Sequence, residues 1–494
     1  MEVLKLQTLL TSIPAYRTSQ DLSGEITNIE QDSRKVVSGT LFICIDGEIV
    51  DGHQFAKQAE ANGATAILAE KEIDVSIPVV YVKDSKRAMA ILADRFYGSP
   101  SQKMKMIGVT GTNGKTTVTH LVEQIVRDAG SETGLIGTMY RKIGREILET
   151  KNTTPDSLTL QRTYHEMLAA DVQTVAMEVS SHALVQGRTY GTDFDIAVFT
   201  NLSQDHLDYH KTMEEYAYAK SLLFAQLGNS YDSEKPKYAI INQDDPVSQR
   251  MKTATAAPVI TYGIDKAADF GATDVMVTSS GTTFKLHTPD GDFDVRIKMI
   301  GKFSIYNCLA ALATSYALEI PIHQAITSLE KVQGVAGRFE IVDAGQDFTV
   351  IVDYAHTPDG LLNVLETIEE FKRSRVFAIV GCGGDRDKGK RPQMAKIAID
   401  YATDPVFTSD NPRSEDPEAI IQDMLAGLPA NAVYQVRTDR KEAITYAVNE
   451  AQAGDVILIA GKGHETYQII GDQVLDFDDR AVAREAIEKK ERLA

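Results

Sequence analysis

The sequence has few cysteines, fewer basic than acidic residues and no long hydrophobic run. Its cysteines, Cys44, Cys308 and Cys382, stand alone and form no CxxC pair. This excludes a disulfide framework and a cysteine-based zinc site, and it predicts buried free thiols in a reducing compartment. Lysine and arginine number 51 against 70 aspartates and glutamates, a formal net charge of -19. Because nucleic acids are bound by clustered positive charge, this balance argues against a nucleic-acid partner.

The hydrophobic residues are spread along the chain. No apolar run approaches the roughly 20 residues that span a bilayer, and the N-terminus has no charged-then-apolar leader. We therefore expect a cytoplasmic monomer without membrane insertion. With 494 residues, 43% of them hydrophobic and 24% charged, the chain has ordinary globular composition but is too long for one core.

A short apolar strand followed by a polar loop and a helix recurs along the chain. Continuous apolar strands covered by helices on both faces are typical of a largely parallel sheet. Ligands bind such sheets at the carboxyl ends of the strands. The sequence therefore predicts an α/β fold with its functional loops at that edge. The strand segments are "MIGVT", "TVAMEVS", "IAVFT", "YAIIN", "FTVIVD", "VFAIVG", "PVFTS" and "VILIA".

Two stretches indicate boundaries between domains. "FYGSPSQKMK" separates a first α/β segment from the segments that follow, and "KVQGVAGRFE" precedes a fresh series of strands and helices. We predict three domains, over residues 1–100, 101–333 and 334–494.

The stretch "VTGTNGKTT" predicts a phosphate-binding loop, although Val109 stands where the common form of this loop has a glycine. Gly111 and Gly114 let the backbone wrap an anion closely, and the following helix offers free N–H groups to phosphates. Lys115 can reach the β- and γ-phosphates, and Thr116 can bind Mg²⁺. The helix is expected to end at Gly130 and to bury one apolar face, made of Val118, Leu121, Val122, Ile125 and Val126.

The loop resembles that of the Mur ligase superfamily, which includes folylpolyglutamate synthetases. The resemblance extends over the chain through "NTTPDS", "MEVSSHAL", "FTNLSQDHLDYH", "YAYAKSLLF", "GKFSIYN", "GRFE", "DYAHTPDG", "DNPR" and "GKGHE". It implies an N-terminal UDP-sugar-binding α/β domain, a central ATP-binding domain with a P-loop-type parallel sheet, and a C-terminal Rossmann-like domain that binds an amino acid. The implied ATP-binding residues are Thr110, Gly111, Thr112, Asn113, Gly114, Lys115, Thr116, Asn307, Arg338 and Asp353.

The resemblance implies a magnesium site beside the phosphate loop. Glu178 and Thr116 can supply oxygen ligands for Mg²⁺, and the family pattern adds His206 and a carbamate formed on Lys220 with CO₂. Taken alone, Glu178 and His206 would be capping or loop residues, and Lys220 a solvated surface lysine. A set of neighbouring residues is interpreted mainly as loop-shaping, namely Asp205, Asp208 and His210.

The family's activity is ATP-dependent amide formation in peptidoglycan precursor synthesis. The branch that this chain resembles acts on UDP-N-acetylmuramoyl-L-alanyl-D-glutamate, whose carboxylate attacks the γ-phosphate of ATP and gives an acyl phosphate for attack by an amine. Lys115, Lys220, Glu178 and His206 are the implied catalytic residues. No protein nucleophile is required, and Ser180 and Ser181 lie outside any GxSxG motif. The residues implied for the UDP-sugar substrate are Ser33, Asn152, Thr153, Thr154, Ser180, Gln186 and Arg188; Arg188 alone could equally be a surface arginine.

The motif "DNPR" predicts which amino acid is added. Its arginine, Arg413, offers a bidentate fork to the side-chain carboxylate of meso-2,6-diaminopimelate, which lysine lacks. Family members that add lysine usually lack this arginine, although Asn-Pro alone would also indicate a simple turn. His356 of "DYAHTP" stands where other branches of the superfamily often carry lysine, so a direct phosphate contact from this position is left open. The residues implied for diaminopimelate are Arg386, Asp410, Asn411, Pro412, Arg413, Gly461 and Glu465.

Three alternatives remain open. One is an L-lysine-adding ligase of the same family. Another is a folylpolyglutamate synthetase-like ligase, against which the long first domain and "DNPR" argue. The third is an ATP-dependent switch without ligation, which would not need Arg386, Arg413 and Glu465 to converge on an amino acid.

Overall fold

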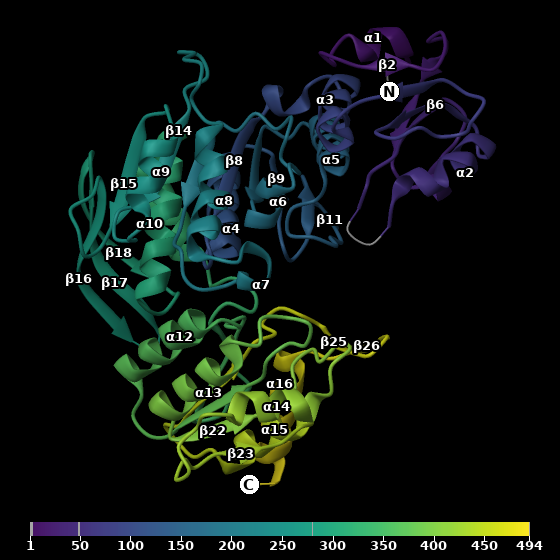
Figure 1. Ribbon diagram of the computed structural model, residues 1–494. Coiled ribbons are helices and arrows are strands. Elements are labelled where there is room, and N and C mark those ends of the chain that lie inside the picture. Colours follow the sequence, from purple (N-terminus) through teal and green to yellow (C-terminus); the bar gives the residue numbers. More distant parts are fainter. Residues whose placement is uncertain (1–2, 48–49, 279, 494) are drawn as a thin grey trace.

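The computed structural model describes residues 3–47, 50–278 and 280–493, and it forms three main sheets from successive parts of the chain (Figure 1). The predicted boundaries near residues 100 and 333 fall between these sheets and remain predictions. The first sheet contains parallel strands except for β2, which pairs antiparallel to β7. Its order is β2 (Arg17–Thr18), β7 (Val79–Tyr81), β6 (Ala64–Ala69), β5 (Thr40–Ile43) and β4 (Asn28–Glu30).

Short helices surround the first sheet, and a small pair of strands lies beside it. The strands are β1 (Leu4–Lys5) and β3 (Glu25–Ile26). The helices are α1 (Leu6–Leu10), α2 (Ala56–Ala61) and α3 (Ser85–Phe96), with 3-10 turns at Ser33–Lys35, Gly52–Phe55 and Pro100–Lys103. Helix α3 packs against α5 (Ser157–Ala169) and so joins this part to the middle of the chain.

The central sheet has 11 strands and carries the phosphate loop. Its order is β11 (Glu146–Leu148), β10 (Arg141–Ile143), β9 (Thr133–Ile136), β12 (Thr174–Glu178), β8 (Lys105–Thr110), β13 (Ile196–Phe199), β14 (Tyr238–Asn242), β15 (Val259–Gly263), β16 (Phe270–Thr278), β17 (Gly281–Thr288) and β18 (Gly291–Ile297).

The predicted largely parallel sheet is confirmed, with antiparallel strands added at both of its edges. The central strands pair in parallel, namely β9, β12, β8, β13, β14, β15 and β16. At one edge β10 pairs antiparallel with β9 and β11, and at the other edge β17 pairs antiparallel with β16 and β18. The β17–β18 hairpin turns through Pro289 and Asp290, between the paired residues Thr288 and Gly291.

Helices cover both faces of the central sheet, because successive strand residues point to opposite sides. Ile107 packs with α4 and α10, whereas its neighbour Met106 packs with α5 and α8. Helix α4 buries its predicted apolar face and has Gly130 with φ +96° just beyond its C-cap, as predicted. The helices are α4 (Lys115–Asp128), α5, α6 (Ser181–Val185), α7 (Leu207–His210), α8 (Met213–Ala225), α9 (Ser248–Ala254), α10 (Lys302–Ala317) and α11 (Ile322–Lys331).

The C-terminal sheet has six strands with a parallel centre. Its order is β19 (Glu340–Ile341), β20 (Thr349–Asp353), β24 (Val456–Ala460), β21 (Val376–Val380), β22 (Asp404–Phe407) and β23 (Gln435–Val436). A hairpin of β25 (Tyr467–Ile470) and β26 (Gln473–Asp476) follows. The helices are α12 (Pro358–Phe371), α13 (Lys390–Tyr401), α14 (Pro417–Leu425), α15 (Arg440–Glu450) and α16 (Asp479–Leu493).

All three cysteines are buried free thiols, as predicted. Burial raises the pKa of each thiol to about 12. Among the described residues, no helix combines the length and apolar character needed to cross a bilayer.

Candidate active site

The phosphate loop connects β8 to α4, as the sequence predicts. Gly111 and Gly114 have φ values of +154° and +87°, which non-glycine residues rarely adopt. A Cβ atom on Gly111 would overlap the hydroxyl of Thr200, and one on Gly114 would lie 2.5 Å from Asn307 Oδ1. Both glycines are therefore required by the close approach of neighbouring segments.

Glu178 and Thr116 form the centre of a buried polar cluster beside this loop. The Thr116 hydroxyl donates to the Glu178 carboxylate, with oxygen separations of 3.0 and 3.1 Å. The Glu178 carboxylate, which is 1% exposed, also accepts from the backbone N–H and the hydroxyl of Thr138. Arg338, from the C-terminal part of the chain, donates to Thr116 Oγ1 over 3.0 Å.

Two lysines converge on the phosphate loop. The Lys115 ammonium donates to the carbonyls of Gly111 and Thr112, and the Lys220 ammonium donates to the Gly111 carbonyl over 2.7 Å. Lys220 is 1% exposed and lies 4.4 Å from the ring centre of Tyr216. Burial, and the charge of Lys115, hold the pKa of Lys220 well below its usual range. The alternative of a solvated surface lysine is therefore wrong.

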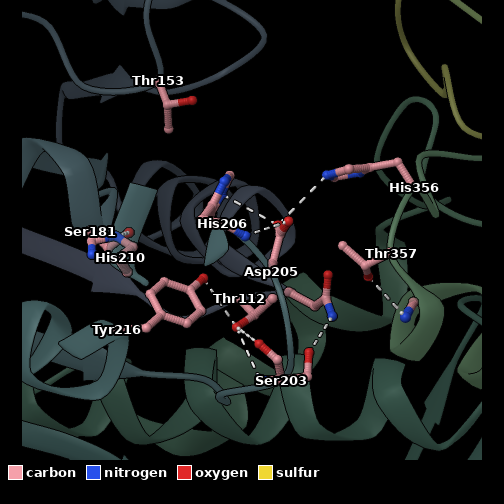
Figure 2. A network of polar contacts seen from close by, with 12 residues as sticks. Thr112, Thr153, Ser181, Ser203, Asp205, His206, His210, Tyr216, His356 and Thr357 are labelled. Atoms are coloured by element: carbon pink, nitrogen blue, oxygen red, sulfur yellow. Dashed lines mark hydrogen bonds and ion pairs between the residues drawn. The ribbon is translucent and has the colours of Figure 1, made fainter. Parts of the chain in front are cut away.

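Asp205 connects the central and C-terminal parts of the site. Figure 2 shows its carboxylate between two imidazole rings, with Oδ2 3.3 Å from His206 Nε2 and 3.9 Å from His356 Nε2. Burial lowers the pKa of His206 to about 3 and that of His356 to about 4. Burial would raise the pKa of Asp205, but the neighbouring His206, His356 and Lys390 side chains lower it to about 2. We therefore assign an ionised Asp205 and neutral imidazoles at pH 7.

Asp205 thus does more than the loop-shaping role predicted for it. It does accept the backbone N–H of His206, as a loop-shaping carboxylate would. His210 is held by the Ser181 hydroxyl at 2.8 Å and stacks on Tyr216, which fits the structural interpretation of this histidine (Figure 2).

A cavity of about 410 Å³ lies between the central and C-terminal parts, next to the phosphate loop. Its lining includes Asn307, Arg338 and Asp353, all predicted to bind ATP. Asp353 accepts the backbone N–H of Phe339, and burial raises its pKa to about 6. Asn113 lines the same cavity and bonds Asp359 of α12, so the loop itself contacts the C-terminal part.

A second cavity, of about 150 Å³, surrounds the polar cluster and is called the phosphate cavity below. Figure 2 shows part of its lining. The residues that line it are Thr112, Asn113, Gly114, Lys115, Thr116, Thr138, Thr153, Glu178, Ser180, Ser181, Asp205, His206, Tyr216, Lys220, Arg338, Tyr354 and His356.

Four of the residues predicted for the UDP-sugar substrate form one connected group. Arg188 donates to the Thr154 carbonyl and to the Gln186 side chain, and the Thr154 hydroxyl accepts the backbone N–H of Ser180. Ser180 also caps α6 by accepting the Ala183 N–H. Arg188 is thus more than a solvated surface arginine.

The remaining substrate residues are dispersed. Thr153 bonds Thr138 in the phosphate cavity, whereas Asn152 is exposed. Ser33 lies in the N-terminal part, where its hydroxyl bonds Gln58. Among described residues, neither Ser33 nor Asn152 lines the three cavities.

A third cavity, of about 280 Å³, is called the amino-acid cavity below. It brings together most residues predicted for diaminopimelate: Arg386, Asp410, Asn411, Arg413, Gly461 and Glu465. Pro412 is not part of its lining, but its carbonyl accepts the Glu415 N–H, so the turn indicated by Asn-Pro is also present. Asn411 donates to the Glu465 carboxylate over 2.8 Å. Five residues line both this cavity and the phosphate cavity: Thr153, Asp205, His206, Tyr354 and His356.

Several residues of the site were not predicted from the sequence. Lys390 lines the amino-acid cavity and is 6% exposed, and Lys462 bonds Asn411 and Glu465 from beneath that cavity. The spacing of Lys390, Met394 and Ala398, which all face inward on α13, could have indicated a buried lysine. Tyr354 and Thr138 carry no such local signal.

The residues present fit a magnesium ion that arrives with a nucleotide. Within residues 3–47, 50–278 and 280–493, no group of three His, Cys, Asp or Glu side chains is placed to hold a metal by itself. Magnesium does not need such a group, because it takes phosphate and water oxygens together with one or two protein oxygens. The adjacent oxygens of Thr116 and Glu178 can supply these.

Family models match three successive parts of the chain. The model described as Mur ligase family, catalytic domain, matches residues 25–97. The Mur ligase middle domain matches residues 109–315. The model described as Mur ligase, glutamate ligase domain, matches residues 337–463.

Curated relatives and solved structures agree with these matches. A Listeria innocua protein named UDP-N-acetylmuramoyl-L-alanyl-D-glutamate--2,6-diaminopimelate ligase is 69% identical, over 99% of this chain and 100% of its own. A Geobacillus thermodenitrificans protein of the same name is 56% identical, again over 99% and 100%. A solved structure of a ligase with this name is 34% identical, with a TM-score of 0.72 over 99% of this chain and 100% of that chain. The chain belongs to the Mur ligase family.

Proposed function

We propose that this protein is the ATP-dependent ligase that joins meso-diaminopimelate to UDP-N-acetylmuramoyl-L-alanyl-D-glutamate, in peptidoglycan precursor synthesis. One observation carries the proposal: a lysine-rich phosphate cavity and an arginine-containing amino-acid cavity share five lining residues. An activated carboxylate in the first can therefore be reached by an amine held in the second. Relatives with 55–69% identity carry the name of this activity.

The phosphate loop binds ATP in this proposal. Backbone N–H groups at the start of α4 receive the phosphates, and Lys115 moves from its loop carbonyls onto the β- and γ-phosphates. The purine and ribose occupy the neighbouring cavity, which Asn307, Arg338 and Asp353 line. The residues from Thr110 to Thr116 form the loop that holds the nucleotide.

Two anions must meet at the phosphate cavity, since the D-glutamate carboxylate attacks the γ-phosphate in line. A magnesium ion held by Thr116 and Glu178, with His206 and a Lys220 carbamate, would screen their mutual repulsion. Lys115 contributes positive charge from the protein itself. The site's remaining contribution is the positioning of the two reacting groups.

Lys220 has the environment that carbamate formation requires. Only a neutral amine reacts with CO₂, and burial next to Lys115 favours the neutral form of Lys220. The resulting carbamate anion would lie beside the phosphate loop, where the Lys220 nitrogen already contacts Gly111.

The UDP-sugar dipeptide extends from the phosphate cavity toward the N-terminal part. Its peptide end would contact the group of Thr153, Thr154, Ser180, Gln186 and Arg188, in which Arg188 suits a carboxylate or phosphate. Its uridine end would reach Ser33, and Asn152 would lie along the path.

The amino-acid cavity selects diaminopimelate. Arg413 would pair with the side-chain carboxylate and Arg386 with the other carboxylate, while Gly461, Glu465 and the 410–412 turn hold the distal ammonium end. An amino acid without the second carboxylate would leave Arg413 without its ionic partner, which disfavours L-lysine.

The proposal is tested by phosphate release from ATP with Mg²⁺ and the UDP-sugar dipeptide, with meso-diaminopimelate, L-lysine or no amine. We expect turnover only with diaminopimelate. Turnover with lysine would support a ligase activity but refute the role of Arg413. ATP hydrolysis that does not depend on an amine would favour the ATP-dependent switch. The cytoplasmic location and monomeric state remain predictions, which cell fractionation and light scattering would test.

A further inference from the structure

Lys390 is a buried cation to which the mechanism above assigns no role. It begins α13 in the motif "DRDKGKR", is 6% exposed and lines the amino-acid cavity. Within the described part of the chain, its ammonium makes no side-chain hydrogen bond or ion pair. Lys388, two residues earlier, is instead exposed and pairs with Glu415 over 3.1 Å. Because most of the side chain is buried and the residue lines the cavity, its ammonium group is placed to bind an anionic ligand there.

Lys390 lines the amino-acid cavity together with Asp205 and His356, and these two residues also line the phosphate cavity. Figure 2 shows Asp205 and His356 facing each other where the two cavities meet. Lys390 therefore shares a cavity with the residues at which an amine from one cavity would meet an acyl group in the other.

The anions expected in this region can be assigned to different cations. The two carboxylates of diaminopimelate have Arg386 and Arg413, which line the amino-acid cavity as Lys390 does. Lys115 approaches the transferred phosphoryl group from the loop side, and Arg338, which lines the phosphate cavity from the C-terminal part, already donates to Thr116. Lys390 has no such side-chain partner among the described residues, and a phosphoryl dianion is the ligand that an ammonium group binds as a point charge.

We propose that Lys390 binds the phosphoryl group of the acyl phosphate from the C-terminal side and stabilises it as the amine attacks. The inference rests on the proposed ligase function. In the step concerned, the amine nitrogen forms a bond to the acyl carbon, and the bond between that carbon and the phosphate oxygen breaks. The electron pair leaves with inorganic phosphate, which takes up the proton lost by the amine. Lys390 stays protonated throughout and supplies charge.

Substitution of Lys390 tests this role, with Lys388→Met as the matched control from the same motif. Two rates are measured: complete ligation, and acyl phosphate formation without amino acid, trapped by hydroxylamine as the hydroxamate. We expect Lys390→Met to lower both rates by about 100-fold, the usual cost of losing one such contact. The KM for diaminopimelate should stay within about twofold, because its carboxylates have other partners. Lys390→Arg should recover part of both rates, and Lys388→Met should match the wild type.

Three results would overturn the assignment. A KM for diaminopimelate raised tenfold or more with unchanged hydroxamate formation would make Lys390 an amino-acid ligand instead. Wild-type rates in Lys390→Met would remove any role in binding. Equal losses in Lys390→Arg and Lys390→Met would deny the importance of the positive charge. The thermal midpoint of unfolding of each variant shows whether it folds normally. If Lys390→Met is destabilised, Lys390→Gln is measured in its place. A wild-type enzyme without amine-dependent turnover would instead refute the proposed function itself, independently of Lys390.

Discussion

The phosphate cavity and the amino-acid cavity use their polar groups differently. In the phosphate cavity, protein hydrogen bonds already fix the main side chains: Glu178 accepts from Thr116 and Thr138, and Lys115 and Lys220 both donate to the Gly111 carbonyl. These groups are preorganised by backbone and neighbouring side chains of the central sheet.

The amino-acid cavity leaves its cations less engaged. Among the described residues, Arg386, which is exposed, donates only to the carbonyl of its neighbour Asp385, and Lys390 has no side-chain partner. Arg413 donates to the Gly384 carbonyl over 2.9 Å. The comparison indicates that the side chains of the phosphate cavity are held in place by the protein itself. The amino-acid cavity instead leaves donors available for its ligand, so single substitutions there can change specificity.

The largest effect is expected from Lys220→Ala in the phosphate cavity. In the proposed mechanism Lys220 carries a carbamate that helps to hold magnesium; without this anion we expect turnover to fall by about 10³-fold. The assay is phosphate release at saturating substrates, with and without added bicarbonate. Lys331→Ala, an exposed lysine at the end of α11, is the control. Undiminished turnover of Lys220→Ala would rule out an essential role.

Arg413→Ala should have the next largest effect and act on specificity. Without the Arg413 guanidinium, the side-chain carboxylate of diaminopimelate loses a charged partner, so kcat/KM for diaminopimelate should fall by about 10²-fold. The KM for ATP should not change, because Arg413 does not line the cavity of about 410 Å³ proposed for the purine and ribose. Arg437→Ala is the control, because it removes the same charge from the same part of the chain. An unchanged kcat/KM for diaminopimelate would contradict the assignment.

A smaller effect is expected from Gly114→Ala, which tests how rigid the phosphate loop is. Gly114 and Gly130 both have positive φ, but a Cβ atom meets Asn307 only at Gly114 and nothing within 4 Å at Gly130. The positive φ should cost each alanine about 1 kcal/mol of stability, and the contact with Asn307 should make the loss larger for Gly114→Ala. Only Gly114→Ala should raise the KM for ATP, by roughly tenfold. Equal KM values in the two variants would show that the contact with Asn307 is unimportant.

The smallest effect on turnover is expected from Asp353→Asn, which keeps an acceptor for the Phe339 N–H. Burial raises the pKa of Asp353 from 3.8 to about 6. Between these values the folded chain holds more protons at this site than the unfolded chain, so stability falls as the pH rises through this window. The Asn variant should lack this contribution, on the order of 2–3 kcal/mol. Thermal midpoints between pH 4 and pH 7 measure it, and parallel pH profiles for wild type and variant would contradict it.

The predictability of the two cavities follows from how they are built. The phosphate loop is contiguous, so its glycines, Lys115 and Thr116 could be predicted from spacing alone. Lys220 needed the family resemblance, because a lysine on a helix gives no sign of burial by itself. Its spacing from Tyr216 and Leu223 did place all three on one face, and all three are buried.

The amino-acid cavity is assembled from loops far apart in the sequence. Asp205 and Asp208 come from the central part, and Arg386, Arg413 and Glu465 follow three different strands of the C-terminal sheet. Motifs identified most of these residues one by one. They did not reveal Lys390, because its neighbours Lys388 and Arg391 make the segment look like an ordinary basic turn; only its spacing from Met394 and Ala398 could have indicated burial. The antiparallel edges of the central sheet were also missed, since their alternating strands differ from the apolar runs at its centre.

The most direct test of the account is a crystal structure with a non-hydrolysable ATP analogue, the UDP-sugar dipeptide and meso-diaminopimelate. We predict the side-chain carboxylate of diaminopimelate at hydrogen-bonding distance from Arg413, with its reacting amine at the junction of the two cavities, beside Asp205 and His356. Diaminopimelate bound outside the amino-acid cavity, or with its reacting amine turned away from the phosphate cavity, would contradict the account.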